Sequence, residues 1–283
     1  MQEVRRKGSC ALLEKLEKER GTKFLALIYS DESAMDDSDV DVVYGLVDSL
    51  ANEQSIEKLD LIIDSLGGDA SAAYGIVKVI RKYVDEFNVF IPGKAKSAAT
   101  ILALGSDRIY MNPRSRLGPI DPLVTHPYTR VWIPARSVIY FIEDMLPGVS
   151  KLGLQEWFLK IDYAHVGFCR LALDEAREYA RRLLKEYHLK KARDEEIEEV
   201  VKRLTGYPSH DFYIDSKEAS NIGLNIEMMK GNVKKLSDEV LRIYKRELDR
   251  VVFIAETVKD RKEVRRQDIG GSRCCSHRYR RIS

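Results

Sequence analysis

Four apolar runs that alternate with helical segments constrain the fold of this 283-residue chain more than any other feature. A continuous apolar run of four to six residues is typical of a strand buried on both faces of a sheet. Between the runs, apolar residues recur at the spacing of an amphipathic helix. Strands that alternate with helices predict parallel βαβ units with right-handed crossovers, and therefore an α/β fold. The predicted strands are 24–29 (FLALIY), 59–64 (LDLIID), 88–92 (NVFIP) and 108–111 (RIYM).

A helix is predicted near each end of the chain. An amphipathic helix over 11–20 ends at Gly21, and a last helix runs from an N-cap at Ser237 to about residue 260. Between them, helices are expected over 137–191, with a break near Pro147-Gly148. These elements predict four parts: an N-terminal helix (1–21), a main domain (22–230), a C-terminal helix (231–260) and a disordered basic tail (261–283).

The net charge of +2 conceals an uneven distribution along the chain. Residues 261–283 contain eight Lys and Arg against two Asp and Glu, which leaves a net charge of −4 on the rest. A mildly acidic main domain gives no reason to expect a nucleic-acid partner. The four cysteines form no CxxC pair, so we expect neither a disulfide framework nor a metal site, and no cofactor. No apolar run reaches the ~18 residues of a membrane span, and no secretory signal is evident, which predicts a cytoplasmic protein without a membrane span.

The segment Asp64-Ser-Leu-Gly-Gly-Asp69 lies where a predicted strand meets a helix. This end of a parallel sheet usually carries the ligand site. Paired glycines there leave backbone N–H groups accessible, and such donors suit an oxyanion. The simpler interpretation is a tight turn that needs two conformationally permissive residues.

The next strand leads into Gly93-Lys-Ala-Lys-Ser-Ala-Ala-Thr100, where Ser97 begins a short helix. An isolated serine at this position is usually an N-cap. The segment lacks the G-x-S-x-G of a hydrolase nucleophile elbow and the upstream glycine of a P-loop.

Together these segments resemble a known family. DSLGGD, the 30-residue spacing from Gly67 to Ser97, and KSAATILALGSDRIYMNPRSRLGPIDP are similar to the ClpP/signal-peptide-peptidase-A class of serine peptidases, and most closely to the serine dehydrogenase proteinase family. The segments 209–214 (SHDFYI) and 217–224 match the end of the same signature. The resemblance covers about residues 22–228 and implies the ClpP/crotonase ββα superhelix.

The resemblance also implies roles for individual residues. Ser97 matches the nucleophile, and Gly67 or Gly68 with the N–H of Ala98 matches the oxyanion hole. The sequence departs from the closest family at Ala98-Ala99, where glycines are usual.

The general base is left open. In ClpP a histidine follows the nucleophile, and here Ile120 or Asp121 stands at that place. His210 and Lys151 are nearly equal candidates, with His210 slightly favoured because Ser209-His210-Asp211 belongs to the signature and Asp211 aligns with the ClpP triad aspartate. Lys160 and His126 are weaker candidates, and any single lysine is more often a solvated helix residue.

Three functions follow in order of preference. The first is a serine endopeptidase that acts on peptide or protein substrates and forms a homo-oligomer, as this class usually does. The second is an acyl-CoA enzyme on the related crotonase fold. The third is an inactive structural or adaptor subunit, which the missing histidine and Ala98-Ala99 keep open.

Overall fold

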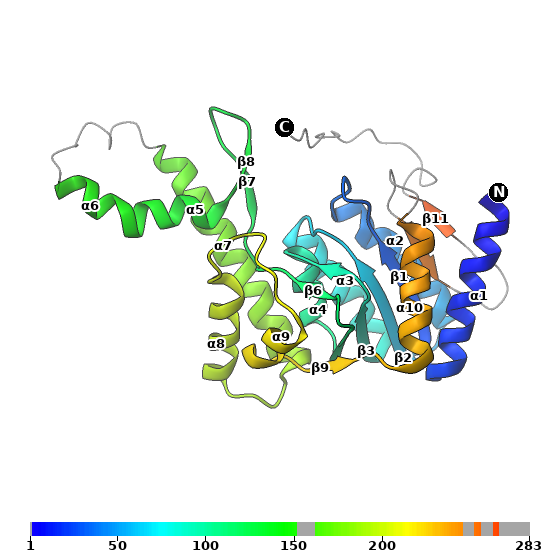
Figure 1. The fold of residues 1–283 in the computed structure, drawn as a ribbon. Coiled ribbons are helices and arrows are strands. Elements are labelled where there is room, and N and C mark those ends of the chain that lie inside the picture. Colours follow the sequence, from blue (N-terminus) through cyan, green and yellow to red (C-terminus); the bar gives the residue numbers. More distant parts are fainter. Residues whose placement is uncertain (1, 152–161, 246–251, 256–262, 266–283) are drawn as a thin grey trace.

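A seven-stranded sheet forms the centre of the computed structural model, which describes residues 2–151, 162–245, 252–255 and 263–265 (Figure 1). Its strand order is β11-β10-β1-β2-β3-β5-β9, and the five strands from β1 to β9 run parallel. The predicted α/β fold with a mostly parallel sheet is confirmed. The strands are β1 (Lys23–Ile28), β2 (Ile56–Asp64), β3 (Val84–Ile91), β4 (Lys94–Ala95), β5 (Arg108–Met111), β6 (Arg116–Leu117), β7 (Leu123–Thr125), β8 (Trp132–Pro134), β9 (Ile226–Met228), β10 (Val252–Ala255) and β11 (Glu263–Arg265).

Helices cover both faces of this sheet. The helices are α1 (Gln2–Arg20), α2 (Asp37–Ala51), α3 (Ala70–Tyr83), α4 (Ala98–Leu104), α5 (Ala135–Tyr140), α6 (Leu146–Lys151), α7 (Tyr163–Leu183), α8 (Asp194–Thr205), α9 (Ser216–Ile222) and α10 (Gly231–Tyr244), with π-helical turns η1 (Phe141–Met145) and η3 (Leu184–His188). Every helix in the described part of the chain is too short or too polar to cross a lipid bilayer.

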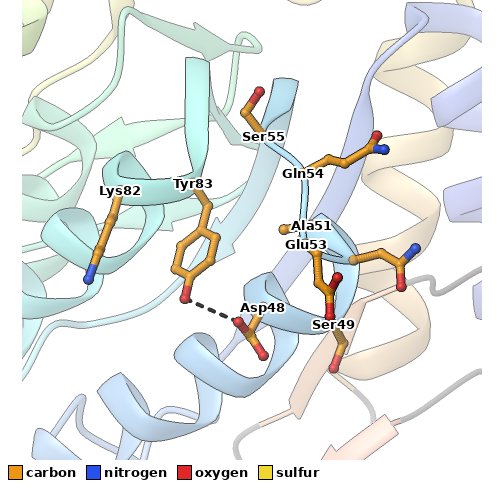
Figure 2. Close-up of a pocket in the computed structure, with 9 residues that line it drawn as sticks. Asp48, Ser49, Ala51, Glu53, Gln54, Ser55, Lys82 and Tyr83 are labelled. Atoms are coloured by element: carbon orange, nitrogen blue, oxygen red, sulfur yellow. Dashed lines mark hydrogen bonds between the residues drawn. The ribbon is translucent and has the colours of Figure 1, made fainter.

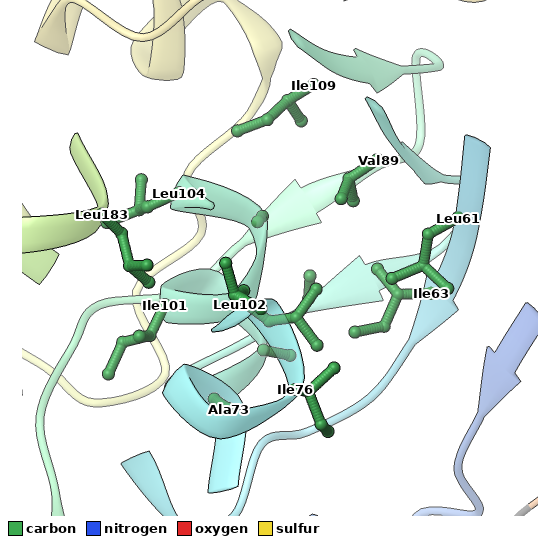
Figure 3. Packing of buried hydrophobic residues seen from close by; sticks show 14 of the residues in the cluster. Leu61, Ile63, Ala73, Ile76, Val89, Ile101, Leu102, Leu104, Ile109 and Leu183 are labelled. Carbon is green, nitrogen blue, oxygen red and sulfur yellow. The ribbon is translucent and has the colours of Figure 1, made fainter. Parts of the chain in front are cut away.

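The alternation of side chains along the buried strands separates two hydrophobic cores. On one face, Leu61 and Val89 pack with Ile76 of α3 and Leu102 of α4 in the larger core (Figure 3). On the other face, α1 and α10 cover Phe24, Ile62 and Phe90. The strands β1, β2 and β3 are buried on both faces along most of their length, which explains why their sequences lack the regular alternation of apolar and polar residues.

The N-terminal helix is longer than predicted, and its end is as expected. Leu12, Leu13 and Leu16 of α1 are buried, and Gly21 follows with φ +65°. Its N–H donates to the carbonyl of Glu17 at 2.7 Å, as in a left-handed helix C-cap.

The C-terminal part differs from the helix predicted over 231–260. Helix α10 ends at Tyr244, and β10 follows within the range predicted to be helical. Ser237 lies inside α10 and is fully buried, so it is not the N-cap. The apolar β10 pairs antiparallel with β1, where Leu25 lies opposite Ala255. Local propensity did not predict this strand, because the strand forms by pairing with the edge of β1, which is far away in the sequence. Residues 263–265, predicted to be disordered, form β11 beside it.

An arm built from β7, β8, α5, η1, α6 and the start of α7 projects from the sheet (Figure 1). Its own core is small and centres on Ala135, Ile139 and Leu173. The break predicted at Pro147-Gly148 is absent, because these residues lie within α6, directly after the turn η1. Many large apolar side chains on the arm are exposed: Tyr128, Val131, Trp132, Tyr140, Phe141, Met145, Tyr163, Phe168 and Leu171.

Candidate active site

The two segments that the sequence singled out lie side by side. Ser65 after β2 pairs with Ala95 of β4, through hydrogen bonds from the Ser65 N–H to Lys94 and from the Lys96 N–H to Ser65, at 3.0 and 3.1 Å. This pairing sets Gly67 directly against Lys96 and Ser97, the two residues that follow β4. Gly67 has φ +109°, and a β-carbon there would lie 2.7 Å from the Lys96 carbonyl oxygen. Glycine is therefore required at Gly67 for both conformation and space.

The second glycine is held by the acidic loop before α2. Gly68 has φ +148°, and a β-carbon would lie 2.2 Å from the carbonyl oxygen of Met35. Met35 accepts a hydrogen bond from Asp69 and donates one to Gly67, at 2.9 and 2.8 Å. The N–H of Gly67 is taken up by the Ser65 hydroxyl at 3.0 Å. The N–H of Gly68 has no hydrogen-bond acceptor among the described residues, which makes it the available donor of the pair.

Ser97 adopts a backbone conformation that is unfavourable for a residue with a side chain. Its φ and ψ are +51° and −118°, in the region that favours glycine, at the junction of β4 and α4. Such strain is a feature of functional turns, where the surrounding structure holds the residue in place. Ser97 occupies the N-cap position of α4, but its side chain makes no capping hydrogen bond. The simpler interpretation of Ser97 as an N-cap therefore does not hold.

The N–H groups near the Ser97 hydroxyl are also unused. Within the described ranges, neither the Ser97 hydroxyl nor the N–H of Ala98 has a hydrogen-bond partner. Gly67 packs closely on Ala98, because a β-carbon on Gly67 would lie 3.1 Å from the Ala98 nitrogen. The half-buried Ser97 thus packs on the Gly-Gly turn, and the N–H groups of Gly68 and Ala98 are both left without an acceptor among the described residues.

The segment 209–214, far away in the sequence, joins this site through β6. Strand β6 pairs with β4, so that Leu117 lies opposite Ala95. Leu117 also exchanges two backbone hydrogen bonds with Ile214, at 2.9 and 3.3 Å. The structure therefore places the Ser97 segment, β6 and the segment that carries His210 next to one another, as the family resemblance implied.

His210 is half-buried and lies near a buried carboxylate. Its Nδ1 atom is buried and has no hydrogen-bond partner within the described structure. Burial raises the pKa of Asp121, an effect that the N–H of Arg136 and the charge of His210 partly oppose. The Arg136 N–H donates to Asp121 Oδ1 at 3.2 Å. Asp121, which stands where ClpP has its histidine, thus lies within electrostatic reach of His210.

Asp211 has a different partner from the one its alignment suggests. Its Oδ1 accepts a hydrogen bond from Lys96 Nζ at 2.6 Å, and this contact lowers the pKa of Asp211. The Lys96 side chain is 9% exposed and that of Asp211 is 81% exposed. Sequence reasoning did not assign Lys96 a role, although a lysine directly before a reactive serine is a visible signal.

The other predicted bases are placed less favourably or are not described. The backbone of Lys151 belongs to α6, at the outer end of the arm and away from β4 and β6 (Figure 1). Lys160 lies outside the described residues. His126 uses its Nδ1 to accept the N–H groups of Tyr128 and Thr129 in the turn between β7 and β8. In the described part, no group of three His, Cys, Asp or Glu side chains is arranged to hold a metal ion.

Two hollows in the surface help to locate the site. One, of about 530 Å³, is lined by Asp48, Lys82 and Tyr83 (Figure 2). It lies near the start of β2, whereas the candidate site lies beyond the other end of this strand. The other, of about 910 Å³, is lined by Arg136, Tyr207 and residues of α7 and α8, and it adjoins the loop that carries His210. The second hollow therefore borders the His210 loop, and the first does not.

Comparisons with known proteins identify the family of the chain. Residues 1–267 match the family model of the ClpP-like SDH-type serine proteinases. Two uncharacterised proteins of Methanocaldococcus jannaschii, MJ0137 and MJ1495, are 30% and 25% identical over 205 and 245 residues, which are 71% and 82% of this chain. The match spans 64% of the length of MJ0137 and 75% of that of MJ1495.

Among solved structures, the chain is similar to a variant of the 1510-N membrane-bound stomatin-specific protease, with a TM-score of 0.45 and 17% identity over 74% of this chain and 81% of that one. It is also similar to a variant of ClpP1 from Listeria monocytogenes, with a TM-score of 0.43 and 14% identity over 78% of this chain and 99% of that one. The family model covers nearly the whole chain, and the Gly-Gly turn and Ser97 come together in the structure. The chain belongs to the ClpP-like SDH-type serine proteinase family.

Proposed function

We propose that the protein is a serine endopeptidase that cleaves peptide bonds through an acyl-enzyme on Ser97. The observation that carries this proposal is the strained Ser97, whose hydroxyl has no described partner and which packs on Gly67 of the Gly-Gly turn. The N–H groups of Gly68 and Ala98 have no acceptor among the described residues. A hydroxyl held in this way can attack a carbonyl carbon, and two backbone donors can stabilise the oxyanion that forms. The substrate is a peptide or protein, and no cofactor is needed.

His210 serves as the general base in this proposal. It takes the proton of Ser97 during the attack and donates it to the leaving amine, and a water molecule then hydrolyses the acyl-enzyme. Asp121 orients the imidazole and stabilises its positive charge. This assignment reverses the order of the ClpP segments, because the carboxylate follows Ser97 and the histidine lies in the later segment.

Two features favour His210 over Lys151. The hydrogen-bonded strands β4 and β6 join the His210 segment to Ser97, whereas α6 lies at the end of the arm. A buried imidazole nitrogen without a partner is also costly unless it has a function. Asp211, paired with Lys96, is not needed as the orienting carboxylate.

Assembly of several copies forms part of the proposal. The arm exposes a run of large apolar side chains over a small core of its own, which is unusual for the surface of a monomer. A second copy of the chain that packs against the arm would cover them. We therefore propose a cytoplasmic homo-oligomer whose contacts include α7.

Labelling of the active site tests the proposal. A fluorophosphonate probe should modify the wild-type protein at Ser97, as identified by mass spectrometry of the modified peptide. Ser97→Ala should abolish the labelling, and His210→Gln should slow it by about 10²–10⁴-fold, because the hydroxyl loses its base. The matched control His126→Gln should label at the wild-type rate.

If His210→Gln labels normally and Lys151→Met does not, the lysine is the base. Absence of labelling in a well-folded wild-type protein would favour an inactive adaptor. Tight binding of a CoA thioester that survives Ser97→Ala would favour an acyl-CoA enzyme.

A further inference from the structure

We propose that the ion pair between Lys96 and Asp211 is a latch that holds the His210 loop against the segment that carries Ser97. Both residues are then positioning residues, since neither is required to touch the substrate. This inference rests on the proposed function, in which His210 is the base. Lys96, directly before the nucleophile, thereby has a role. Asp211 holds the loop in place, and Asp121 orients the imidazole of His210.

The position of Lys96 fits a fixed anchor. Its backbone N–H donates to Ser65 at 3.1 Å, which ties it to the strand that precedes the Gly-Gly turn. Its side chain runs along Gly118, where a β-carbon would lie 2.8 Å from Lys96 Cγ. A residue larger than glycine at Gly118 would displace this side chain. The ammonium group therefore reaches Asp211 along a path that the surrounding backbone defines.

The His210 loop needs such an anchor. Its internal contacts are short-range, with the Asp211 N–H donating to the Ser209 hydroxyl at 3.2 Å and the Phe212 N–H donating to the Ser209 carbonyl at 3.1 Å. The backbone pairing of Ile214 with Leu117 lies four residues beyond His210. From Ser209 to Phe212, the ion pair of Asp211 is the link to the Ser97 segment among the described contacts.

Because Asp211 is exposed, its ion pair can position the His210 loop without contributing much to the stability of the fold. An ion pair with one partner in solvent contributes little to the free energy of folding. Removal of the pair should therefore leave the protein folded and change the geometry of the site. A displacement of about 1 Å at a catalytic group can reduce the rate by about 10²-fold.

The latch also balances the charges that face His210. Two carboxylates, Asp211 on its own loop and Asp121 after β6, interact with His210. Lys96 of the Ser97 segment and Arg116 of β6 offset the charge of Asp211, and Arg136 of α5 offsets that of Asp121. Loss of Lys96 leaves the Asp211 carboxylate unbalanced, so His210 should take up its proton at a higher pH. Loss of the Asp211 charge leaves Lys96 unbalanced, so His210 should take up its proton at a lower pH. A residue with only a structural role would not produce shifts of opposite sign.

The test compares Lys96→Met, Asp211→Asn and Asp211→Glu with a control, Lys78→Met, which removes the surface ion pair of Lys78 with Glu186 (2.8 Å). We expect Lys96→Met to slow labelling of Ser97 by about 10–100-fold, Asp211→Asn to slow it less, and Asp211→Glu to restore most of the rate. The acid limb of the rate–pH profile should move up in Lys96→Met and down in Asp211→Asn. Lys78→Met should leave the rate and the limb unchanged, and all variants should melt within a few degrees of the wild type.

NMR titration of the His210 imidazole provides a readout that does not depend on peptidase activity. If Lys96→Met leaves both the His210 titration and the labelling rate unchanged, the latch is wrong. If the wild-type protein is not labelled at all but both variants displace the backbone amide signals of residues 209–212, the latch stands and the peptidase proposal fails. Equal shifts of the same sign in both variants would also overturn the latch, because they would indicate a general loss of structure.

Discussion

A β-carbon on Gly67 would lie 2.9 Å from the β-carbon of Ser97, closer than side chains pack in folded proteins. The two residues come from different βαβ units, and the absence of a side chain at one of them lets the other occupy its place. The Gly-Gly turn is therefore more than a permissive bend, because its missing side chain lets Ser97 pack directly on it at the edge of the sheet where both strands end.

Gly67→Ala should damage folding and reactivity together. The added methyl group meets backbone atoms that cannot move without distorting β4, and the backbone at φ +109° disfavours any side chain. We expect a loss of about 1–3 kcal/mol in the free energy of unfolding and no labelling of Ser97 by a fluorophosphonate. Urea denaturation measures the first effect.

Gly45→Ala is the matched control, because Gly45 lies in α2 with open space around it. It should stabilise the protein by about 0.5–1 kcal/mol. Wild-type labelling of Gly67→Ala would contradict the close packing of the turn on Ser97.

Ser97→Gly and Ser97→Ala should both be inactive but should differ in stability. Alanine retains the strain of φ +51°, whereas glycine adopts this conformation without cost. Glycine loses more conformational entropy on folding, which offsets part of the gain. We expect Ser97→Gly to exceed Ser97→Ala by about 1 kcal/mol in the free energy of unfolding, measured in parallel urea titrations. A lower stability for the glycine variant would mean that Ser97 is not strained.

Asp121→Asn should reduce the labelling rate without unfolding the protein. The amide keeps the size of the carboxylate and can still accept the N–H of Arg136, but it cannot stabilise an imidazolium. We expect a loss of about 10²–10⁴-fold in rate, with a melting temperature close to that of the wild type. Asp215→Asn, at the N-cap of α9, is a control that changes a carboxylate outside the site. A full rate in Asp121→Asn would assign the orienting role elsewhere.

His188 should make the fold sensitive to acid. The side chain is fully buried, and burial lowers its pKa to about 4 from the usual value of 6.5. Its Nδ1 lies 2.8 Å from the Ser106 carbonyl oxygen, and its Nε2 accepts the N–H of Asn225 at 3.0 Å, so the ring is neutral in the folded state. Because the folded state holds the proton less tightly than the unfolded state, this stability is fully present above pH 6.5. It should be lost as the pH falls towards 4, by up to about 3 kcal/mol.

Urea denaturation at several pH values measures this effect. His188→Gln, which can make both hydrogen bonds without titrating, should show a flatter dependence between pH 6.5 and 4. A dependence equal to that of the wild type would assign the acid sensitivity to other groups.

Substitutions on the arm should dissociate the proposed oligomer. Phe168 and Leu171 of α7 are 59% and 70% exposed, so a charge at either position should not disturb the core. We expect Phe168→Asp with Leu171→Asp to lower the molecular mass measured by light scattering, while Tyr44→Asp on α2 leaves it unchanged. A wild-type protein that is monomeric at micromolar concentration would contradict assembly through the arm.

The sequence by itself determined the parallel sheet and one half of the candidate site. Apolar runs followed by helical periodicity predict βαβ units, and the ends of successive parallel strands must meet at one edge. The proximity of Gly67 and Ser97 follows from that rule, since 30 residues separate them and both follow strands. The predicted helix ends were less accurate, because Pro147 and Ser237 have strong local preferences that the surrounding packing overrides.

Only the tertiary structure decided what completes the site. The pairing of Lys96 with Asp211 joins residues 115 positions apart, and it depends on β6 lying between their segments. The strand β10 likewise forms where a helix was predicted, because the edge of β1 offers partners that no local pattern reveals. Contacts of this kind join segments that are far apart in the sequence. Whether they form depends on loop-closure entropy and on side-chain packing, which no short segment encodes.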